Sequence, residues 1–185
     1  MRTLIPALTL PLLFASCGLL NTQPPADPLR SGDANVQFMV SAAQSNLFEI
    51  QSSQQAVAKT SNAAVKQYAQ DMINMHTDSQ NKLSALASAR NIKLPDAPSP
   101  EQRLIIQALT PLSGAEFDQQ YGKAQLNGHR LTLDVFDSYI KNPQATDAGV
   151  KQFAVDGRPM IKDHLDRART LPQPADAVMA APLSR

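Results

Sequence analysis

Three histidines and one glutamate are the side chains best suited to chemistry in this sequence. The chain has only three histidines, His76, His129 and His164, and each falls on the apolar stripe of an expected amphipathic helix. Glu49 lies beside the apolar stripe of a fourth expected helix, among small and polar neighbours. Neutral imidazoles and a carboxylate suit zinc, iron or manganese. One such side chain from each of four helices predicts a metal site inside a helical bundle.

A purely structural interpretation of the same residues stays open. A single histidine on an apolar stripe is more often a hydrogen-bonded core residue than a ligand, and a glutamate at the edge of a stripe usually reaches water. For the three histidines together, a metal or other polar functional site and a buried polar layer that fixes helix register are equally supported. Met72, Met75 and Met160 neighbour the histidines; we interpret them as core fillers, with copper ligation as a minor alternative.

Several other activities lack their sequence signals. A classical di-iron centre in a bundle needs Glu-x-x-His on two helices, and none of the glutamates Glu49, Glu101 and Glu116 begins that motif. No glycine-rich phosphate loop, G-x-S-x-G elbow or H-E-x-x-H motif is present. The formal net charge of +1 gives no basic stripe for nucleic acid. The residues decide neither for nor against an enzyme.

The helices that must position these side chains can be located by periodicity. Four long amphipathic helices are expected at about residues 35–59, 63–90, 114–141 and 146–171, with apolar residues recurring three and four apart. Caps are expected at Asp33, at the turn 60–62, and at Ser113, whose side chain would form a capping box with Glu116.

The connection from 91 to 113 is long and rich in proline, with a short helix expected at 101–109 behind the cap Ser99. It is long enough to cross the length of a bundle. The pattern therefore predicts an all-α four-helix bundle over residues 35–171 with a long connection between its second and third helices.

The heights of the four candidate ligands along their helices test whether they meet. At about 1.5 Å of rise per residue, Glu49, His76 and His129 fall in one layer if the two short turns lie at opposite ends of the bundle. On the same count His164 lies a turn or more away, and a kink at Pro159 would close part of that gap. Whether His164 joins the layer stays open.

The N-terminus predicts an exported, lipid-anchored protein. Arg2 and the apolar segment 4–15 are typical of a signal peptide, which we expect to cover residues 1–16. The segment LFASC ending at Cys17 resembles a lipobox, in which the cysteine is diacylated. The alternative is ordinary signal cleavage with an incidental cysteine. We favour lipidation, because an exported chain with one cysteine forms no internal disulfide.

The segments beside the bundle complete this prediction. Residues 17–34 would form the lipidated cysteine and a flexible tether, and 172–185 a disordered tail. No later segment is suited to span a bilayer, so the membrane partner would be reached through the acyl chains alone. Gly18, in place of an aspartate, is similar to lipoproteins sorted to an outer membrane, which predicts a periplasm-facing location there.

Three stretches of this sequence also resemble a known family. These are 38–77, 112–129 and 150–168, and their most specific pieces are GAEFD at 114–118 with Tyr121, and His164 following Pro159. They resemble a bacterial family of exported ferritin-like proteins, described as a domain of unknown function and often labelled predicted outer membrane protein. The resemblance covers about residues 36–171.

The resemblance implies a ferritin-like fold and no established activity. It also implies that Glu49, His76, His129 and His164 fall on the family's recurring acidic and histidine positions. By fold analogy, the expected role is metal handling or stress protection by a lipid-anchored bundle whose specific function is unknown. The alternative is a non-catalytic envelope module that binds a protein partner, of unknown identity, through an exposed helix face.

Overall fold

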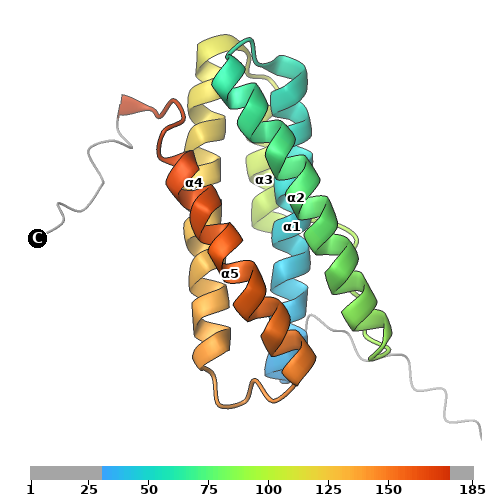
Figure 1. The fold of residues 1–185 in the computed structure, drawn as a ribbon. Helices are drawn as coiled ribbons and strands as arrows, with labels where there is room; N and C mark the ends of the chain where they lie inside the picture. The colour runs from blue at the N-terminus through green and yellow to red at the C-terminus, as the bar shows by residue number, and fades with distance from the viewer. Residues whose placement is uncertain (1–30, 176–185) are drawn as a thin grey trace, which may run out of the picture.

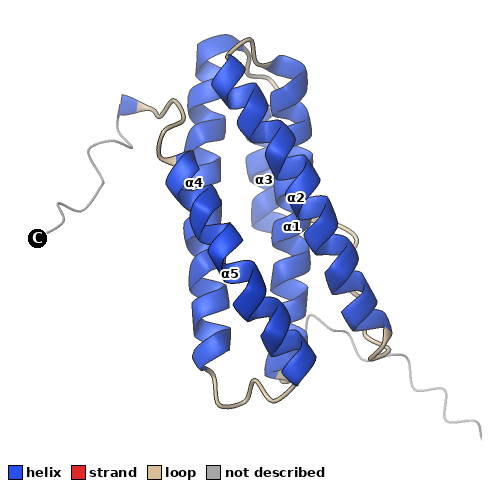
Figure 2. Cartoon of the chain, viewed as in Figure 1, coloured by secondary structure: helices blue, strands red, loops and turns tan. Residues whose placement is uncertain are grey.

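The computed structural model of this chain describes residues 31–175. Within that range the chain forms five α-helices and no strands, which confirms the all-α class (Figures 1 and 2). The helices are α1 (Ala34–Lys59), α2 (Ala63–Ser88), α3 (Pro100–Leu109), α4 (Gly114–Lys141) and α5 (Ala148–Ala168). None of them is long and apolar enough to cross a membrane. The expected signal peptide, Cys17 and most of the tether lie outside the described residues, as do residues 176–185 of the expected tail.

Most helix starts follow from local capping chemistry. Asp33 accepts hydrogen bonds from the first backbone N–H groups of α1, and Asn62 does the same for α2, as expected. Ser99 and Gln102 form a reciprocal capping box at α3. The fifth helix starts two residues later than expected, because Asp147 takes the cap position and accepts from the backbone N–H of Val150.

The start of α4 differs from the expectation in one respect. Ser113 occupies the cap position, but its side chain makes no capping hydrogen bond, so the predicted capping box with Glu116 is wrong. Gly114, which follows the cap, has a φ of 58°. That left-handed conformation favours glycine, and it turns the chain into the helix by backbone geometry in place of a side-chain cap.

The helices pack as a bundle in which α2 and α5 cross over α1 and α4 (Figure 1). The pairs α1–α2 and α4–α5 are joined by short connections and run antiparallel, and α1 also packs on α4. The short helix α3 lies behind α1 and α4, on the opposite side from α2 and α5 (Figure 1). Side chains of α1 hold it there, since Gln55 and Lys59 donate to backbone carbonyls near its C-terminal end.

The long connection from α2 to α4 spans the length of the bundle. The α1–α2 turn lies at one end and the α4–α5 turn at the other, and α2 and α4 consequently run in the same direction (Figure 1). This is the arrangement in which Glu49, His76 and His129 were expected to share a layer.

The apolar core is divided into two clusters along the bundle axis. One cluster lies near the α4–α5 turn, and its buried residues include Phe38, Met39, Leu83, Phe136 and Ile161. The other lies near the α1–α2 turn, and its buried residues include Ala56, Met72, Leu109, Phe117 and Tyr121. In each of the four long helices the chain passes from one cluster to the other through buried polar residues. The candidate ligands lie in this intervening layer.

A candidate metal centre

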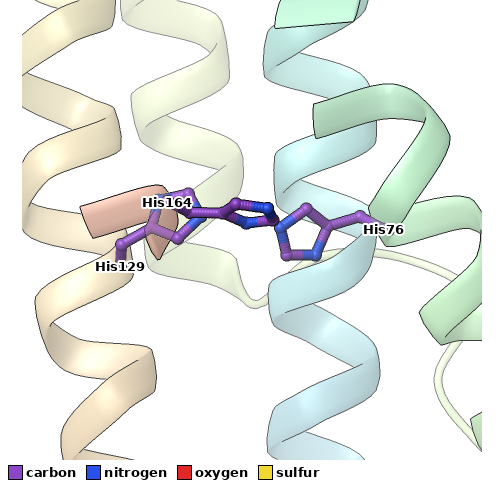
Figure 3. Close-up of side chains that lie close together, drawn as sticks. All are labelled: His76, His129 and His164. Atoms are coloured by element: carbon purple, nitrogen blue, oxygen red, sulfur yellow. The ribbon is translucent and has the colours of Figure 1, made fainter. Parts of the chain in front are cut away.

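The three histidines meet at the middle of the bundle. His76 on α2, His129 on α4 and His164 on α5 point toward one another (Figure 3), and one ligand nitrogen of each lies within 4.8 Å of the others. The ring centroids are 5.6 Å apart for His76 and His129, and 5.2 Å apart for each of the other two pairs. All three side chains are at most 1% exposed. Three buried imidazoles this close could hold a metal ion.

Hydrogen bonds fix which nitrogen of His76 and His129 carries the proton. Nδ1 of His76 lies 2.9 Å from Oδ1 of Asn46, and Nδ1 of His129 lies 3.0 Å from the backbone carbonyl of Gln125. Amide and carbonyl oxygens only accept, so Nδ1 must donate in both rings. The neutral rings therefore present the lone pair of Nε2, as a metal ligand does.

His164 is held through its other nitrogen. Its Nε2 lies 3.2 Å from the thioether sulfur of Met75, a weak acceptor, which leaves the lone pair on Nδ1. The other nitrogen of each ring, Nε2 of His76 and of His129 and Nδ1 of His164, has no hydrogen-bond partner among the described residues. Buried polar atoms of native proteins rarely stay unpaired. Three of them, one from each neighbouring ring, could serve as ligands of a metal ion.

The surroundings keep the imidazoles neutral. Burial lowers the pKa of His129 to about 3 and that of His164 to about 4. Burial also lowers the pKa of His76, and the neighbouring imidazoles lower it further. Near neutral pH every ring therefore offers an unprotonated nitrogen, so a metal ion does not have to displace a proton from any of them.

Glu49 lies beside the histidine cluster, on the side of His129 that faces α1. Its Oε1 is 3.7 Å from Nδ1 of His129, and it is not among the three residues whose ligand atoms lie close together. The side chain is 2% exposed, and burial raises its pKa to about 8 although a hydrogen bond from Gln125 opposes the shift. Near pH 7 the carboxyl group and the imidazole are thus both mostly neutral. Glu49 as a direct fourth ligand stays a prediction.

The structure answers the open question about His164. The α4–α5 connection takes up residues 142–147, so His129 lies about 18 Å before the end of α4 and His164 about 24 Å after the start of α5. The remaining difference is closed because α5 runs obliquely across α4 (Figure 1). The helix is continuous through Pro159. His164 therefore shares the layer with His76 and His129.

Sequence reasoning missed some residues around the centre. Asn46, on the same helix as Glu49, accepts a hydrogen bond from His76 and donates one to Gln80. Gln125 and Tyr68 were missed: the first accepts from His129, and the Tyr68 hydroxyl donates to the backbone carbonyl of His164. The helical spacing offered a signal for Gln125, which lies one turn before His129.

The donor set fits a borderline transition-metal ion. Three neutral imidazoles match the ligands of catalytic zinc sites, which hold zinc through three protein ligands and keep a fourth position open. In a tetrahedral zinc site the nitrogens would lie about 3.4 Å apart, so an ion would draw the rings inward by roughly 1 Å. The hydrogen bonds that His76 donates to Asn46 and His129 donates to Gln125 orient the rings in the way that outer partners of metal-bound histidines do.

Comparison with known proteins places the chain in a family. Residues 20–171 match the family described as Domain of unknown function (DUF4142). The chain belongs to this family. The DUF4142 match covers every helix of the structure, including all three histidines and Glu49. No match is found among curated proteins.

A solved structure supports the fold. A crystal structure of a conserved hypothetical protein from Mycobacterium tuberculosis is similar to this one with a TM-score of 0.57. The two chains are 15% identical, and the match covers 83% of this chain and 96% of the other. At this identity the likeness shows the fold alone.

Proposed function

We propose that this protein binds one transition-metal ion between His76, His129 and His164. The observation that carries the proposal is the set of three buried imidazoles from three helices, whose ligand atoms lie within 4.8 Å of one another and each of which has one nitrogen without a hydrogen-bond partner. Zinc fits the neutral donor set best, with iron and manganese as the other candidates. Glu49 supports the site from behind His129 and contributes negative charge when it loses its proton.

The cellular role proposed with this site is metal handling or stress protection at the cell envelope. Two sequence features support it: the lipobox-like segment that ends at Cys17, and the resemblance to exported ferritin-like proteins. The protein would then be a ferritin-like four-helix bundle, anchored by acyl chains on Cys17 and facing the periplasm, with the outer membrane as its location. The packing of the four long helices around one polar layer is the arrangement in which bundles build metal sites.

Elemental analysis of the untagged domain, residues 31–175, tests the metal proposal. Purified without chelator and then equilibrated with zinc, the domain is expected to retain one ion per chain. The variants His76→Ala and His129→Ala are expected to lose the ion while keeping their helical circular dichroism. As a control, Asn74→Ala changes an exposed residue on the same helix as His76 and is expected to retain the ion.

One result would contradict the proposal. A folded domain that retains none of zinc, iron, manganese or copper would leave the histidines as a buried polar layer. The non-catalytic envelope module would then be the better hypothesis, and its partner should be sought on the exposed helix faces.

A further inference from the structure

The proposed metal centre is enclosed, so an ion needs a route to it. The three histidines and Glu49 are each at most 2% exposed. Close packing around a buried site leaves no space for a hydrated ion unless the structure provides an opening. An entry path is one of the features that a real metal site must have.

A cavity on the α1–α3–α4 face comes close to this centre. Its volume is about 640 Å³, and it lies between the groove of α1 and α4 and the short helix α3. Two of its wall residues, Phe48 and Gly128, directly precede Glu49 and His129 in the sequence. Of these two wall residues, Gly128 lies against the Glu49 side chain.

Gly128 leaves space in this wall beside Glu49. A Cβ atom placed on Gly128 would lie 3.2 Å from Oε1 of Glu49 and 3.3 Å from the Phe48 ring. Because glycine lacks that atom, no side chain of α4 fills the space between these two groups at this position. A methyl group at this position would fill the gap.

Polar groups lie on the cavity side of Gly128 and on the side that faces Glu49. On the cavity side, the Thr132 hydroxyl donates to the backbone carbonyl of Gly128 at 2.9 Å and lies 3.3 Å from the Ser45 hydroxyl. Both hydroxyls line the cavity. On the inner side, Oε2 of Glu49 is buried without a hydrogen-bond partner. Hydroxyl and carboxylate oxygens can replace water around a divalent cation one ligand at a time.

We propose that this cavity is the entry route of the metal ion, with Gly128 as its opening and Glu49 as the relay to the histidines. A divalent cation would pass the hydroxyls of Ser45 and Thr132, exchange water for the Glu49 carboxylate, and then move past the His129 ring to the imidazole nitrogens that have no hydrogen-bond partner. The His129 ring is the adjacent one, because its protonated Nδ1 lies 3.7 Å from Oε1 of Glu49. The route deepens the metal-binding function proposed above and rests on it.

Stopped-flow uptake of Co²⁺ by the metal-free domain tests the route. Cobalt is a spectroscopic probe for zinc sites, and its absorption reports ligation directly. The variant Gly128→Ala is expected to slow association about tenfold, which corresponds to about 1.4 kcal/mol in the activation barrier. Dissociation is expected to slow by the same factor, because a narrowed route affects both directions and leaves the equilibrium affinity unchanged.

Two further variants make the test specific. Glu49→Gln preserves the shape of the side chain and abolishes the carboxylate form, which an incoming cation would bind, so it should also slow association. Ala124→Val adds bulk to the same cavity wall one turn away from Gly128, and it should leave the association rate unchanged. Replacing glycine by alanine inside a helix favours the helix, so Gly128→Ala is not expected to unfold the domain.

The possible outcomes distinguish a wrong entry route from the absence of a metal site. If the wild-type domain takes up Co²⁺ and Gly128→Ala takes it up at the same rate, the route is wrong and the metal site stands. An affinity change that arises in dissociation alone overturns the route as well. If the wild-type domain takes up no Co²⁺, both proposals fail.

Discussion

Which nitrogen of each imidazole carries the proton decides what the centre can bind. Asn46 is the clearest case, because its side-chain oxygen accepts the Nδ1 proton of His76 while its amide donates to Gln80. The bond to Gln80 holds the Asn46 side chain in place, and the bond from His76 keeps the His76 ring in one tautomer and one orientation. The nitrogen that His76 would present to a metal ion is thus set by Asn46, which is not one of the proposed ligands.

Replacing Asn46 should weaken metal binding while the ligands stay in place. We expect Asn46→Ala to lower zinc affinity by about 10- to 100-fold, the usual effect of removing an outer partner of a metal-bound histidine. Competition against a chromophoric chelator measures this. Asn74→Ala on the same helix serves as the matched control. Equal affinity in both variants would mean that the tautomer of His76 is fixed by another contact.

The lowered pKa values of the histidines predict acid sensitivity of the metal-free protein. Between the folded values, about 3 for His129 and about 4 for His164, and the unfolded value near 6.5, the unfolded chain binds more protons. Folding stability therefore falls as the pH falls through this window, by roughly 2 kcal/mol for each histidine at pH 5.

Glu49 acts in the opposite direction, and the balance can be measured. Its raised pKa means that the folded state binds more protons between about pH 4.5 and 8, so acidification from pH 7 to 5 increases folding stability by roughly 2–3 kcal/mol. Three histidines outweigh one glutamate. We expect the urea midpoint of the metal-free domain to be lower at pH 5 than at pH 7. A higher midpoint at pH 5 would show that Glu49 dominates.

Among the elements, α4 depends on a glycine at its contact with the chain after α5. A Cβ atom on Gly122 would lie 2.1 Å from the backbone carbonyl oxygen of Pro172. Residues 171–174 pack here, with Leu171 and Pro174 buried. The part of the expected tail that the structure describes is therefore docked on α4.

Gly122→Ala is expected to displace this docked segment. The clash is with backbone, which cannot move aside as a side-chain end can, so we expect a loss of about 1–3 kcal/mol in the free energy of unfolding. Urea denaturation measures the loss. In a chain that ends at Leu171 the clash is absent, and there the same substitution should be neutral or stabilising by up to about 1 kcal/mol. A similar loss of stability in both chains would mean that the destabilisation does not come from the contact with Pro172.

The helices show why some elements could be predicted from sequence and others could not. The caps at Asp33, Asn62 and Ser99 depend on a few neighbouring residues, and they were predicted correctly. The capping box at Ser113 failed because the left-handed Gly114 sets the chain direction there. That conformation cannot be deduced from residue spacing.

The candidate site could be predicted in part for the same reason. Spacing placed His76, His129 and His164 on inward faces, since burial follows helical periodicity. The position of His164 in the layer depended on the oblique course of α5, and its contact with Met75 depended on side-chain geometry across helices. These are tertiary features that a single sequence does not encode locally.

For the whole molecule, the polar layer should cost stability in the absence of metal. Each unpartnered buried nitrogen costs about 1–3 kcal/mol. The triple variant with His76→Leu, His129→Leu and His164→Leu is therefore expected to gain stability over the metal-free wild type, on the order of 3 kcal/mol. Asn46 keeps Gln80 as a partner in this variant.

Urea denaturation of both metal-free proteins at pH 7 and pH 5 measures this effect. The triple variant should bind no zinc, and its loss of stability on acidification should vanish, since the protonating groups that destabilise the fold are gone. A triple variant that is less stable than the metal-free wild type would mean that the histidine layer itself stabilises the bundle.

The division of the core into two apolar clusters has a consequence for how the bundle melts. Without an ion, the clusters are separated by a layer that contains three buried nitrogens without hydrogen-bond partners, so we expect each cluster to open as its own cooperative unit. A metal ion would tie α2, α4 and α5 together between the clusters. We then expect hydrogen exchange to show separate protection for the two ends of the metal-free bundle and one shared opening once the metal is bound. A bound ion would thus convert two cooperative unfolding units into one.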